Sequence, residues 1–372
     1  MKKVLFVFGT RPEAIKLAPI IICFLKDKAI DVRIAVTAQH REMLDQVLKF
    51  FDLKVHYDLN VMTPNQTLHQ LTAVLIQRIT DEVLLKENFD FVVVQGDTTT
   101  VMAAAMASFY QKIKIIHVEA GLRSYDLNSP FPEEMNRVLT SKLAHYHFCP
   151  TERSKQNLYD ENILNHVYVV GNSVIDALLI GLDKVSKTTE SDFVNKYNFI
   201  DFSKKIILVT CHRRENFGQP FLDICDALLS IANDHINEVE IVYPVHLNPN
   251  INQVANQKLI AKNIKLIPPL DYPELIWMMD KSHIILTDSG GIQEEAPSLG
   301  KPVLVLRDVT ERIEGVEAGT AIMVGTNKEK IVFETKKLLN DSNHYLAISK
   351  ASNPYGDGQT SEKIKQIILE SE

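Results

Sequence analysis

Short runs of β-branched and other apolar residues alternate with amphipathic stretches along the whole of this 372-residue chain. In the first half, runs that are apolar on both faces span Val4–Phe8, Val32–Val36, Phe91–Val94 and Ile113–Val118. Between the first two, Ala14, Leu17 and Ile21 recur at helical spacing. Strands that are buried on both faces are typical of parallel sheets covered by helices. The alternation therefore predicts a doubly wound α/β sheet.

A second series of apolar runs begins after Val167–Val170 and spans Ile206–Val209, Ile241–Tyr243, Ile264–Ile267, Ile284–Leu286 and Val303–Leu306. A chain of this length exceeds what one compact core usually holds. We therefore expect two Rossmann-like domains that face each other across a cleft. The first spans residues 1–170, with a C-terminal helix at about 355–372 packing back on it. The second spans residues 171–354 and binds a nucleotide, and the polar segment 186–205 is expected to be a surface excursion.

Composition excludes several classes of protein. A net charge of −7 argues against a nucleic-acid binder, which usually has a basic face. The four cysteines are scattered without CxxC spacing, as expected of reduced thiols in the cytoplasm. The apolar run after Met1 ends at Gly9, too early for a signal peptide or a membrane span. We expect a cytoplasmic protein with no membrane partner.

The segment Thr287–Gly291, which follows an apolar run directly, is the most informative motif. Gly290 and Gly291 have no Cβ, so the backbone after Ser289 can approach a ligand closely, and the following helix points free N–H groups at it. Glu295 lies four residues further on, where it can accept hydrogen bonds from vicinal hydroxyls such as those of a ribose. An ordinary glycine-rich turn is the alternative. The arginines that follow the next strand, Arg307 and Arg312, favour a nucleoside diphosphate site.

Charged residues also follow the strands of the first half. Arg11 and Lys16 come after the first strand and could clamp an anion, or they could be solvated helix charges. Asp97 follows the Phe91 strand, where it could instead cap the next helix. Glu119 follows the Ile113 strand. Acids at consecutive strand ends favour a ligand site, because open α/β sheets bind ligands there.

Glu133 and Arg137 lie four residues apart at the start of a predicted helix, so they share a face and can pair. As surface residues they would form a salt bridge of little consequence. Beside the strand-end carboxylates they would instead belong to a catalytic cluster.

Histidines follow two strands of the second half. His212 lies between a strand end and two arginines, which suits diphosphate contact or proton transfer, although a structural histidine is the alternative. His246 follows the next strand in the same way. His145 and His147 form a tight pair without a carboxylate at metal-ligand spacing, so we interpret them as structural and predict no metal site.

Eight motifs resemble one family: GTRPEAIKLAP, GDTTT, HVEAGLRS, PFPEEMNR, CHRREN, PVHLNP, TDSGGIQEEAPSLGKPV and NPYGDG. Their order and their spread over nearly the whole chain are similar to those of the bacterial non-hydrolysing UDP-N-acetylglucosamine 2-epimerases. The resemblance implies the two-domain GT-B fold, a homodimer and the interconversion of UDP-N-acetylglucosamine (UDP-GlcNAc) and UDP-N-acetylmannosamine (UDP-ManNAc). It also implies that the product supplies surface polysaccharide.

The resemblance further implies roles for residues of this chain. The catalytic set is Asp97, Glu119 and Glu133, with Arg137 and His212 beside them. The UDP contacts are Arg11, Lys16, His212, Ser289, Gly290, Gly291, Glu295 and Arg312. UDP-GlcNAc as an allosteric activator would contact Gln39, His40, Arg214 and His246. Two residues depart from the family pattern: Gln95 stands where many members have His, and Ile313 where a Pro is common.

The chemistry explains why such residues are needed. No carbonyl acidifies the C2 hydrogen of the sugar, and the chain has no GxGxxG motif for a nicotinamide cofactor that would oxidise C3. We therefore expect elimination of UDP to 2-acetamidoglucal and its re-addition, with no cofactor. Cations must stabilise the leaving diphosphate, and carboxylates must serve both faces of C2. The sequence leaves open which acid removes the proton. A GT-B glycosyltransferase, a hydrolysing epimerase and a silent UDP-sugar sensor are the alternatives.

Overall fold

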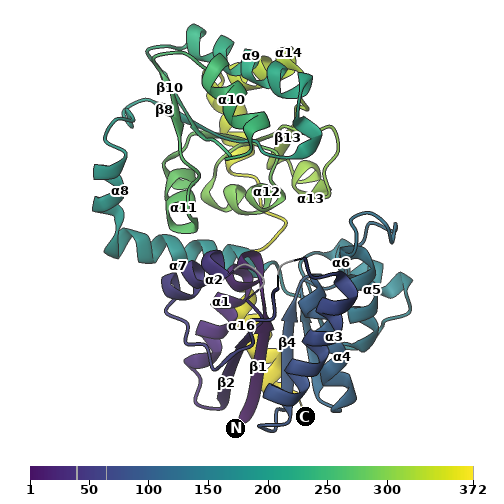
Figure 1. Ribbon diagram of the computed structural model, residues 1–372. Coiled ribbons are helices and arrows are strands. Elements are labelled where there is room, and N and C mark those ends of the chain that lie inside the picture. The colour runs from purple at the N-terminus through teal and green to yellow at the C-terminus, as the bar shows by residue number, and fades with distance from the viewer. Residues whose placement is uncertain (39–40, 64, 372) are drawn as a thin grey trace. The chain divides into compact units, whose positions relative to one another are not determined.

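The protein is represented by a computed structural model that describes residues 1–38, 41–63 and 65–371. It divides into two compact units (Figure 1). Unit 1 comprises Met1–Ala177 and Tyr355–Glu372, and unit 2 comprises Leu178–Pro354. Each unit is built on its own parallel sheet. None of the helices described combines the length and apolar character needed to cross a bilayer.

Within the described residues, the sheet of unit 1 has seven parallel strands in the order β3-β2-β1-β4-β5-β6-β7. Their bounds are β1 Lys2–Phe8, β2 Ile30–Val36, β3 Tyr57–Asp58, β4 Phe91–Gln95, β5 Lys114–Val118, β6 Tyr146–Cys149 and β7 Val167–Val169. The side chains from Val4 to Phe8 are fully buried on both faces of β1, as predicted for a central strand.

The helices of unit 1 form two groups, one in which α1 contacts α2 and α16, and one in which α4 contacts α3 and α5. Their bounds are α1 Arg11–Leu25, α2 Arg41–Phe50, α3 Leu68–Ile79, α4 Thr99–Tyr110, α5 Glu133–Leu143, α6 Glu152–Asp160 and α16 Thr360–Glu370, with a π-helical turn, η1, at Thr80–Leu84. Helix α7, Ser173–Thr188, begins in unit 1 and ends in unit 2. The doubly wound α/β fold that the alternation predicts is confirmed.

The sheet of unit 2 has six parallel strands in the order β10-β9-β8-β11-β12-β13. Their bounds are β8 Lys205–Thr210, β9 Val239–Pro244, β10 Ile264–Ile267, β11 Ile284–Thr287, β12 Val303–Val305 and β13 Ala321–Met323. The helices are α8 Glu190–Lys196, α9 Gln219–Asp234, α10 Pro249–Lys258, α11 Tyr272–Lys281, α12 Gly290–Glu295, α13 Ile313–Glu317, α14 Lys328–Asn340 and α15 Ser342–Ser349, with 3₁₀ turns η2 at Arg214–Asn216 and η3 at Ala296–Leu299. A continuous apolar core joins the strands to α9 and α14.

Strand order reverses once in each sheet. β1 pairs with β2 on one side and with β4 on the other, and β8 pairs likewise with β9 and β11. The carboxyl ends of the strands at such a reversal point are where open α/β sheets bind ligands. We therefore expect ligand-binding residues in the loops after β1 and β4 in unit 1, and in the loops after β8 and β11 in unit 2.

The segment 186–205 is at the surface as predicted, but much of it is helical. Helix α7 continues to Thr188, and α8 has no buried residue. Its polar composition gives no apolar stripe from which a helix could be recognised. The chain returns to the core at Tyr197, which is buried and stacks on Trp277 with ring centroids 5.9 Å apart.

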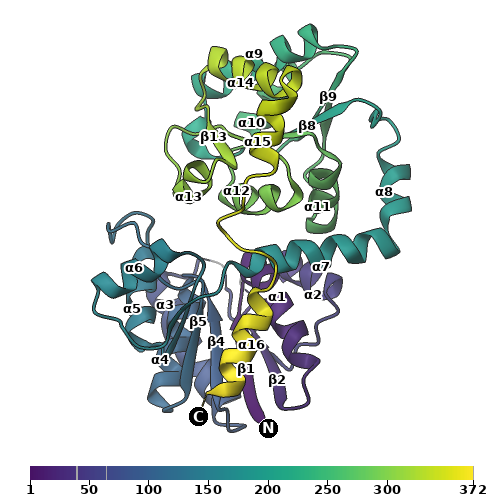
Figure 2. The same cartoon turned by 180° about the vertical axis from the view of Figure 1, so that it is seen from behind.

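The C-terminal helix α16 packs on α1 in unit 1 (Figure 2). Charged side chains form hydrogen bonds with the backbone at both of its ends. The Asp176 carboxylate accepts hydrogen bonds from the backbone N–H groups of Thr360 and Ser361, at 3.3 and 2.8 Å. At the other end, the Lys2 ammonium donates to the carbonyl of Ile368 at 2.6 Å. An anion at the N-terminus and a cation at the C-terminus both match the helix dipole.

Candidate functional site

The loops after β1, β4 and β5 carry the charged residues predicted for the first half. Arg11 begins α1, Asp97 lies two residues beyond β4, and Glu119 follows β5 directly. Because these three strands are neighbours in the sheet, their carboxyl ends lie along one edge of it. Folding therefore brings together groups that lie more than a hundred residues apart in the chain.

Glu119 is the most heavily hydrogen-bonded of these groups. One of its carboxylate oxygens accepts from the ammonium of Lys16 and from the side-chain amide of Asn172, the latter at 3.1 Å. Its other oxygen accepts from the side-chain amide of Gln95. Glu119 has a φ of 63°, an uncommon left-handed conformation for a residue other than glycine. Three donors from three different elements thus stabilise a nearly buried carboxylate in its ionised form.

Asp97 faces a cation from α5. The Arg137 guanidinium lies 2.6 Å from its carboxylate and 2.8 Å from that of Glu134. Burial raises the pKa of Asp97 above its ordinary value, Arg137 works against that rise, and Glu119 adds to it. A raised pKa makes this carboxyl group a better proton donor than an ordinary aspartate.

The predicted pair of Glu133 with Arg137 is wrong. In the part of the chain that the structure describes, Arg137 pairs with Glu134, three residues before it, and with Asp97. Both i−3 and i−4 neighbours are within reach on a helix face, and the sequence does not distinguish them. Glu134 is buried, and its carboxylate also accepts from the backbone of Tyr125 at 3.0 Å. Glu133 occupies the first position of α5 and is partly exposed.

Glu13 joins the loops after β1 and β4. Its fully buried carboxylate accepts from the backbone of Gly9 and Thr10, at 2.9 and 2.7 Å, and from the hydroxyl of Thr98 at 2.6 Å. Thr98 is the N-cap of α4 and follows Asp97. Burial raises the pKa of Glu13, and the hydrogen bonds from Thr98, Gly9 and Thr10 oppose that rise. Glu13 therefore fixes the positions of the two loops that carry Arg11 and Asp97.

Arg11 differs from the other cations of this edge. It forms no ion pair with another described residue, and its side chain is partly exposed at the start of α1.

Two of the residues assigned to an activator site, Gln39 and His40, lie outside the described residues.

In unit 2, His212 and Asp288 meet at the reversal point of the second sheet. His212 follows β8 and Asp288 follows β11. Imidazole Nδ1 lies 3.4 Å from a carboxylate oxygen of Asp288, which is fully buried, whereas about half of the His212 side chain is exposed. The imidazole ring of His246 stacks on that of His212, with centroids 5.7 Å apart and planes 17° apart. Arg214, in η2, is exposed.

The glycine-rich turn carries a cation directly above it. Ser289 is the N-cap residue of α12, and Gly290 is its first residue. A Cβ at Gly290 would lie 3.2 Å from the guanidinium carbon of Arg312, so a side chain there would press on this group. Glu294 accepts from Arg312 Nε at 2.9 Å and orients it. The structure thus brings together Ser289, Gly290 and Arg312, as the motif predicts.

Glu295 is buried on the same turn. Its carboxylate lies 3.8 Å from the position that a Cβ of Gly291 would occupy, and it interacts with the phenol of Tyr272. Burial and the nearby carboxylate both raise the pKa of Tyr272 well above its ordinary value, so the phenol keeps its proton. A phenol that keeps its proton can donate it to the Glu295 carboxylate.

Two histidines in strands of the first sheet, His117 and His147, have structural roles. His147, in β6, is buried and bonds to the carbonyl of Ser141 at 2.9 Å, as the sequence predicts. His117 bonds to the carbonyl of Gly96 at 2.8 Å, and burial lowers its pKa to about 3. Over the described ranges, no three His, Cys, Asp or Glu side chains gather into a group that could hold a metal ion.

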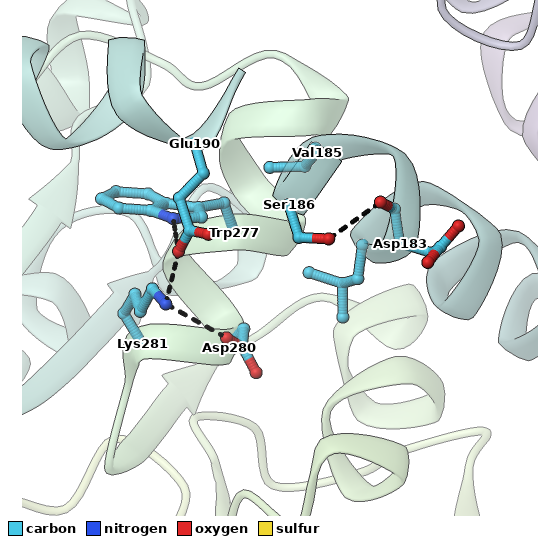
Figure 3. Close-up of a pocket in the computed structure, with 8 residues that line it drawn as sticks. Asp183, Val185, Ser186, Glu190, Trp277, Asp280 and Lys281 are labelled. Carbon is cyan, nitrogen blue, oxygen red and sulfur yellow. Dashed lines mark hydrogen bonds and ion pairs between the residues drawn. The ribbon is translucent and has the colours of Figure 1, made fainter. Parts of the chain in front are cut away.

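Unit 2 also has a cavity of about 320 Å³ between α7, α8 and α11 (Figure 3). It is lined by Leu182, Asp183, Val185, Ser186, Glu190, Trp277, Asp280 and Lys281. The Glu190 carboxylate accepts from the Trp277 indole at 3.4 Å and pairs with Lys281 at 2.8 Å. Three carboxylates against a single ammonium make this cavity unsuitable for a diphosphate, and none of the residues predicted from the motifs lines it.

Comparison with known proteins identifies the family of the chain. A family model for UDP-N-acetylglucosamine 2-epimerase matches residues 24–369. The chain belongs to the UDP-N-acetylglucosamine 2-epimerase family. It is 54% identical over 370 residues to the UDP-N-acetylglucosamine 2-epimerase of Escherichia coli K12, covering 98% of each chain. It is 50% identical over 377 residues to that of Campylobacter jejuni, covering 99% of this chain and 98% of the relative.

Solved structures of UDP-GlcNAc 2-epimerases are also similar over nearly the whole chain. The UDP-GlcNAc 2-epimerase of Neisseria meningitidis, bound to UDP-GlcNAc, is 49% identical with a TM-score of 0.89, covering 99% of this chain and all of that chain. The Methanocaldococcus jannaschii enzyme, in complex with UDP-GlcNAc and UDP, is 37% identical with a TM-score of 0.79, again covering 99% and 100%. The GT-B fold expected from the resemblance is confirmed by these epimerases and by the two parallel sheets.

Several contacts within the candidate site escaped sequence reasoning. Gln95 and Asn172 both donate to Glu119, and each lies at or just beyond the end of a strand. A polar residue at such a position was the available signal. Glu134 was overlooked because Glu133, four residues before Arg137, was expected to be the partner of that arginine. Asp288 belongs to the glycine-rich motif, but nothing in the sequence tells which way its side chain points.

Proposed function

We propose that the protein interconverts UDP-GlcNAc and UDP-ManNAc by eliminating UDP and adding it back. The observation that carries this proposal is the cluster at the carboxyl edge of the first sheet, where Glu119 and Asp97 each face a cation. Family membership and the two solved epimerases with bound UDP-GlcNAc support the choice of substrate. Asp97, Glu119, Glu133, Arg137 and His212 are the proposed catalytic residues.

In the elimination, a carboxylate takes the proton from C2 and the C2–H electron pair becomes the C1=C2 double bond. The electron pair of the C1–O bond leaves with the diphosphate oxygen, so the products are UDP and 2-acetamidoglucal. In the return step, a carboxylic acid on the other face gives a proton to C2, and a UDP oxygen bonds to C1. The configuration at C2 is thereby inverted without an external oxidant or reductant.

The two carboxylates suit different parts of this cycle. Glu119 receives hydrogen bonds from Lys16, Gln95 and Asn172, which favour its ionised form and hence a role as base. Burial raises the pKa of Asp97, which favours a role as proton donor. Exchange of these roles between the forward and reverse directions follows from the reversibility of the reaction.

The second unit supplies the groups that bind the nucleotide. A leaving diphosphate carries developing negative charge, and preorganised cations and N–H donors stabilise it. We assign this role to His212, Arg312 and the turn Ser289–Gly291. The family resemblance assigns diphosphate contacts to Arg11 and Lys16 as well. Glu295 is proposed to accept from the ribose hydroxyls.

Further properties are proposed from the family resemblance. They are a homodimer, activation by UDP-GlcNAc at a second site that includes Arg214 and His246, the non-hydrolysing outcome, and supply of the product to surface polysaccharide. None of them is needed for the chemistry at C2.

The reaction is tested by one NMR experiment, in which UDP-GlcNAc is incubated with the protein in deuterated water. UDP-ManNAc with deuterium at C2 is the expected product. Free N-acetylmannosamine with UDP would identify a hydrolysing epimerase instead. A requirement for an acceptor would indicate a GT-B glycosyltransferase, and unchanged substrate that is nevertheless bound would indicate a sensor.

A further inference from the structure

The residues of the turn after β11 lie in two different environments. Ser289, Gly290 and Gly291 form the start of α12, where Arg312 lies over the glycine. Asp288, the residue before them, is fully buried and points back into unit 2 toward the loop after β8. The glycine-rich motif therefore contains an acid that cannot contact a nucleotide, although it lies next to the proposed phosphate site.

One oxygen of Asp288 has an evident structural role. Oδ2 accepts hydrogen bonds from the backbone N–H groups of His212 and Arg213, both at 2.8 Å, and from the side-chain amide of Asn216 at 3.0 Å. These contacts fix the loop that follows β8. They satisfy Oδ2 completely and do not involve the other oxygen.

The second oxygen, Oδ1, has a different environment. It is buried and makes no short hydrogen bond to any described residue, and imidazole Nδ1 of His212 lies 3.4 Å away. A buried carboxylate oxygen is costly without a partner. A proton on Nδ1 of His212 supplies that partner, and pairs of this kind often tighten only when substrate is bound.

The ring of His212 is also restrained on one face. The His246 imidazole stacks on it, and Nδ1 of His246 accepts from the backbone of Asn248 at 3.1 Å, which anchors that second ring to its own loop. The His212 ring thus has Asp288 at its Nδ1 edge and His246 on its face. Flipping the ring would move Nδ1 away from the buried oxygen.

We propose that Asp288 is the positioning residue of His212, which places the proton on Nδ1 and leaves Nε2 to act on the diphosphate. This inference rests on the proposed function in that His212 is taken to contact the leaving group. With Nδ1–H committed to Asp288, Nε2 is the nitrogen that can accept a proton or, once protonated, donate to a diphosphate oxygen. The carboxylate also stabilises the imidazolium, which is the form that best complements the leaving diphosphate.

The first test measures the resting protein and needs no turnover. Nitrogen-15 NMR of histidine-labelled protein distinguishes protonated from unprotonated ring nitrogens, and the spectrum of His212→Gln assigns the resonances. At a pH where His212 is neutral, the proton is expected on Nδ1. A neutral His212 with its proton on Nε2 would overturn the proposal, whatever reaction the protein catalyses.

The second test uses Asp288→Asn. The asparagine oxygen can still accept the hydrogen bonds that reach Oδ2, while its NH₂ group would face Nδ1 of His212 and force the proton to Nε2. A loss in kcat of roughly 10²-fold or more is expected, together with the tautomer change. Asn216→Ala is the matched control, because it removes a donor to Oδ2 and leaves Oδ1 facing the ring. It should keep the proton on Nδ1.

A double-mutant cycle separates positioning from general loosening of the loop. Once His212 is replaced by Gln, Asp288→Asn should cost less than threefold in kcat. An undiminished loss in that background would show that Asp288 does not act through His212. If wild type lacked epimerase activity the proposed function would fail, but the tautomer measurement would still decide the role of Asp288.

Discussion

Lys16 and Glu119 are 103 residues apart in the chain, and their side chains form an ion pair at the carboxyl edge of the first sheet. Lys16 was predicted to bind the diphosphate, yet its ammonium here engages the proposed base. These two roles are compatible, because an ammonium has three hydrogens to donate. The pairing means that Lys16 affects both the charge of Glu119 and the binding of an anion.

Replacement of Glu119 tests the base directly. Glu119→Gln keeps the size of the side chain but cannot take a proton from C2, so kcat should fall by roughly 10²-fold or more. Asp97→Asn should have an effect of the same order. Steady-state kinetics measures both, with the exposed residue change Glu152→Gln in α6 as control. A Glu119→Gln variant with near-native kcat would remove this residue from the mechanism.

The adjacent acids Glu133 and Glu134 should respond differently to the same change. Glu133→Gln is expected to lower kcat by roughly 10²-fold with little effect on stability. Glu134→Gln weakens the pairing of a buried carboxylate with Arg137, so it should lower the free energy of unfolding by about 1–3 kcal/mol. Kinetics and thermal denaturation of both variants make the comparison. Equal effects of the two changes on both quantities would contradict the assignment.

Gly290→Ala should impair nucleotide binding through Arg312. The new methyl group would lie 3.2 Å from the guanidinium carbon and displace it, so KM should rise more than kcat falls. Glu295→Ala should show the same pattern. In an Arg312→Ala background the methyl group has nothing to displace, and Gly290→Ala should then cost little. If the two changes had additive effects on KM in the double variant, Gly290→Ala would act through another part of the turn and not through Arg312.

Activity should not depend on a metal ion or a bound redox cofactor. The proposed elimination is carried by side chains alone, so full activity is expected after treatment with EDTA and exhaustive dialysis. The NMR assay described above measures it before and after. Activity that is lost and then restored by a divalent cation would refute this expectation.

Glu13 should make stability depend on pH. Burial raises its pKa above the ordinary value of 4.5, so the folded protein binds this proton more tightly than the unfolded chain. The free energy of unfolding therefore falls as pH rises from 4.5 through the raised value. Glu13→Gln stays neutral and should lack this part of the fall. Urea denaturation of both proteins across that window gives the difference, and parallel curves would show that Glu13 contributes nothing.

The strands could be predicted because burial on both faces requires apolar residues throughout each strand. Runs that are apolar on both faces must be buried between helices, and β1, β2, β4 and β5 fall within two residues of the predicted bounds. Strand β13, Ala321–Met323, was missed because only one of its three residues, Ile322, is β-branched, whereas the equally short β7 and β12 each have two valines. Helix α8 was missed because a surface helix without a buried face has no apolar period.

The residues of the site were easier to predict than their partners. A polar residue that follows an apolar run marks a strand end, and this signal found Asp97, Glu119 and His212. Side-chain direction is set by tertiary contacts that no local pattern records. The pairing of Arg137 with Glu134 and the inward turn of Asp288 therefore required the structure.

The contact between Lys2 and the carbonyl of Ile368 spans 366 residues of sequence, and it has a consequence for synthesis. During translation β1 leaves the ribosome early, whereas α16 follows only after all of unit 2. Until then, the surface of α1 that α16 covers has no native partner within the chain. The nascent polypeptide therefore leaves this face of α1 uncovered for most of its elongation, so a chaperone has time to bind there.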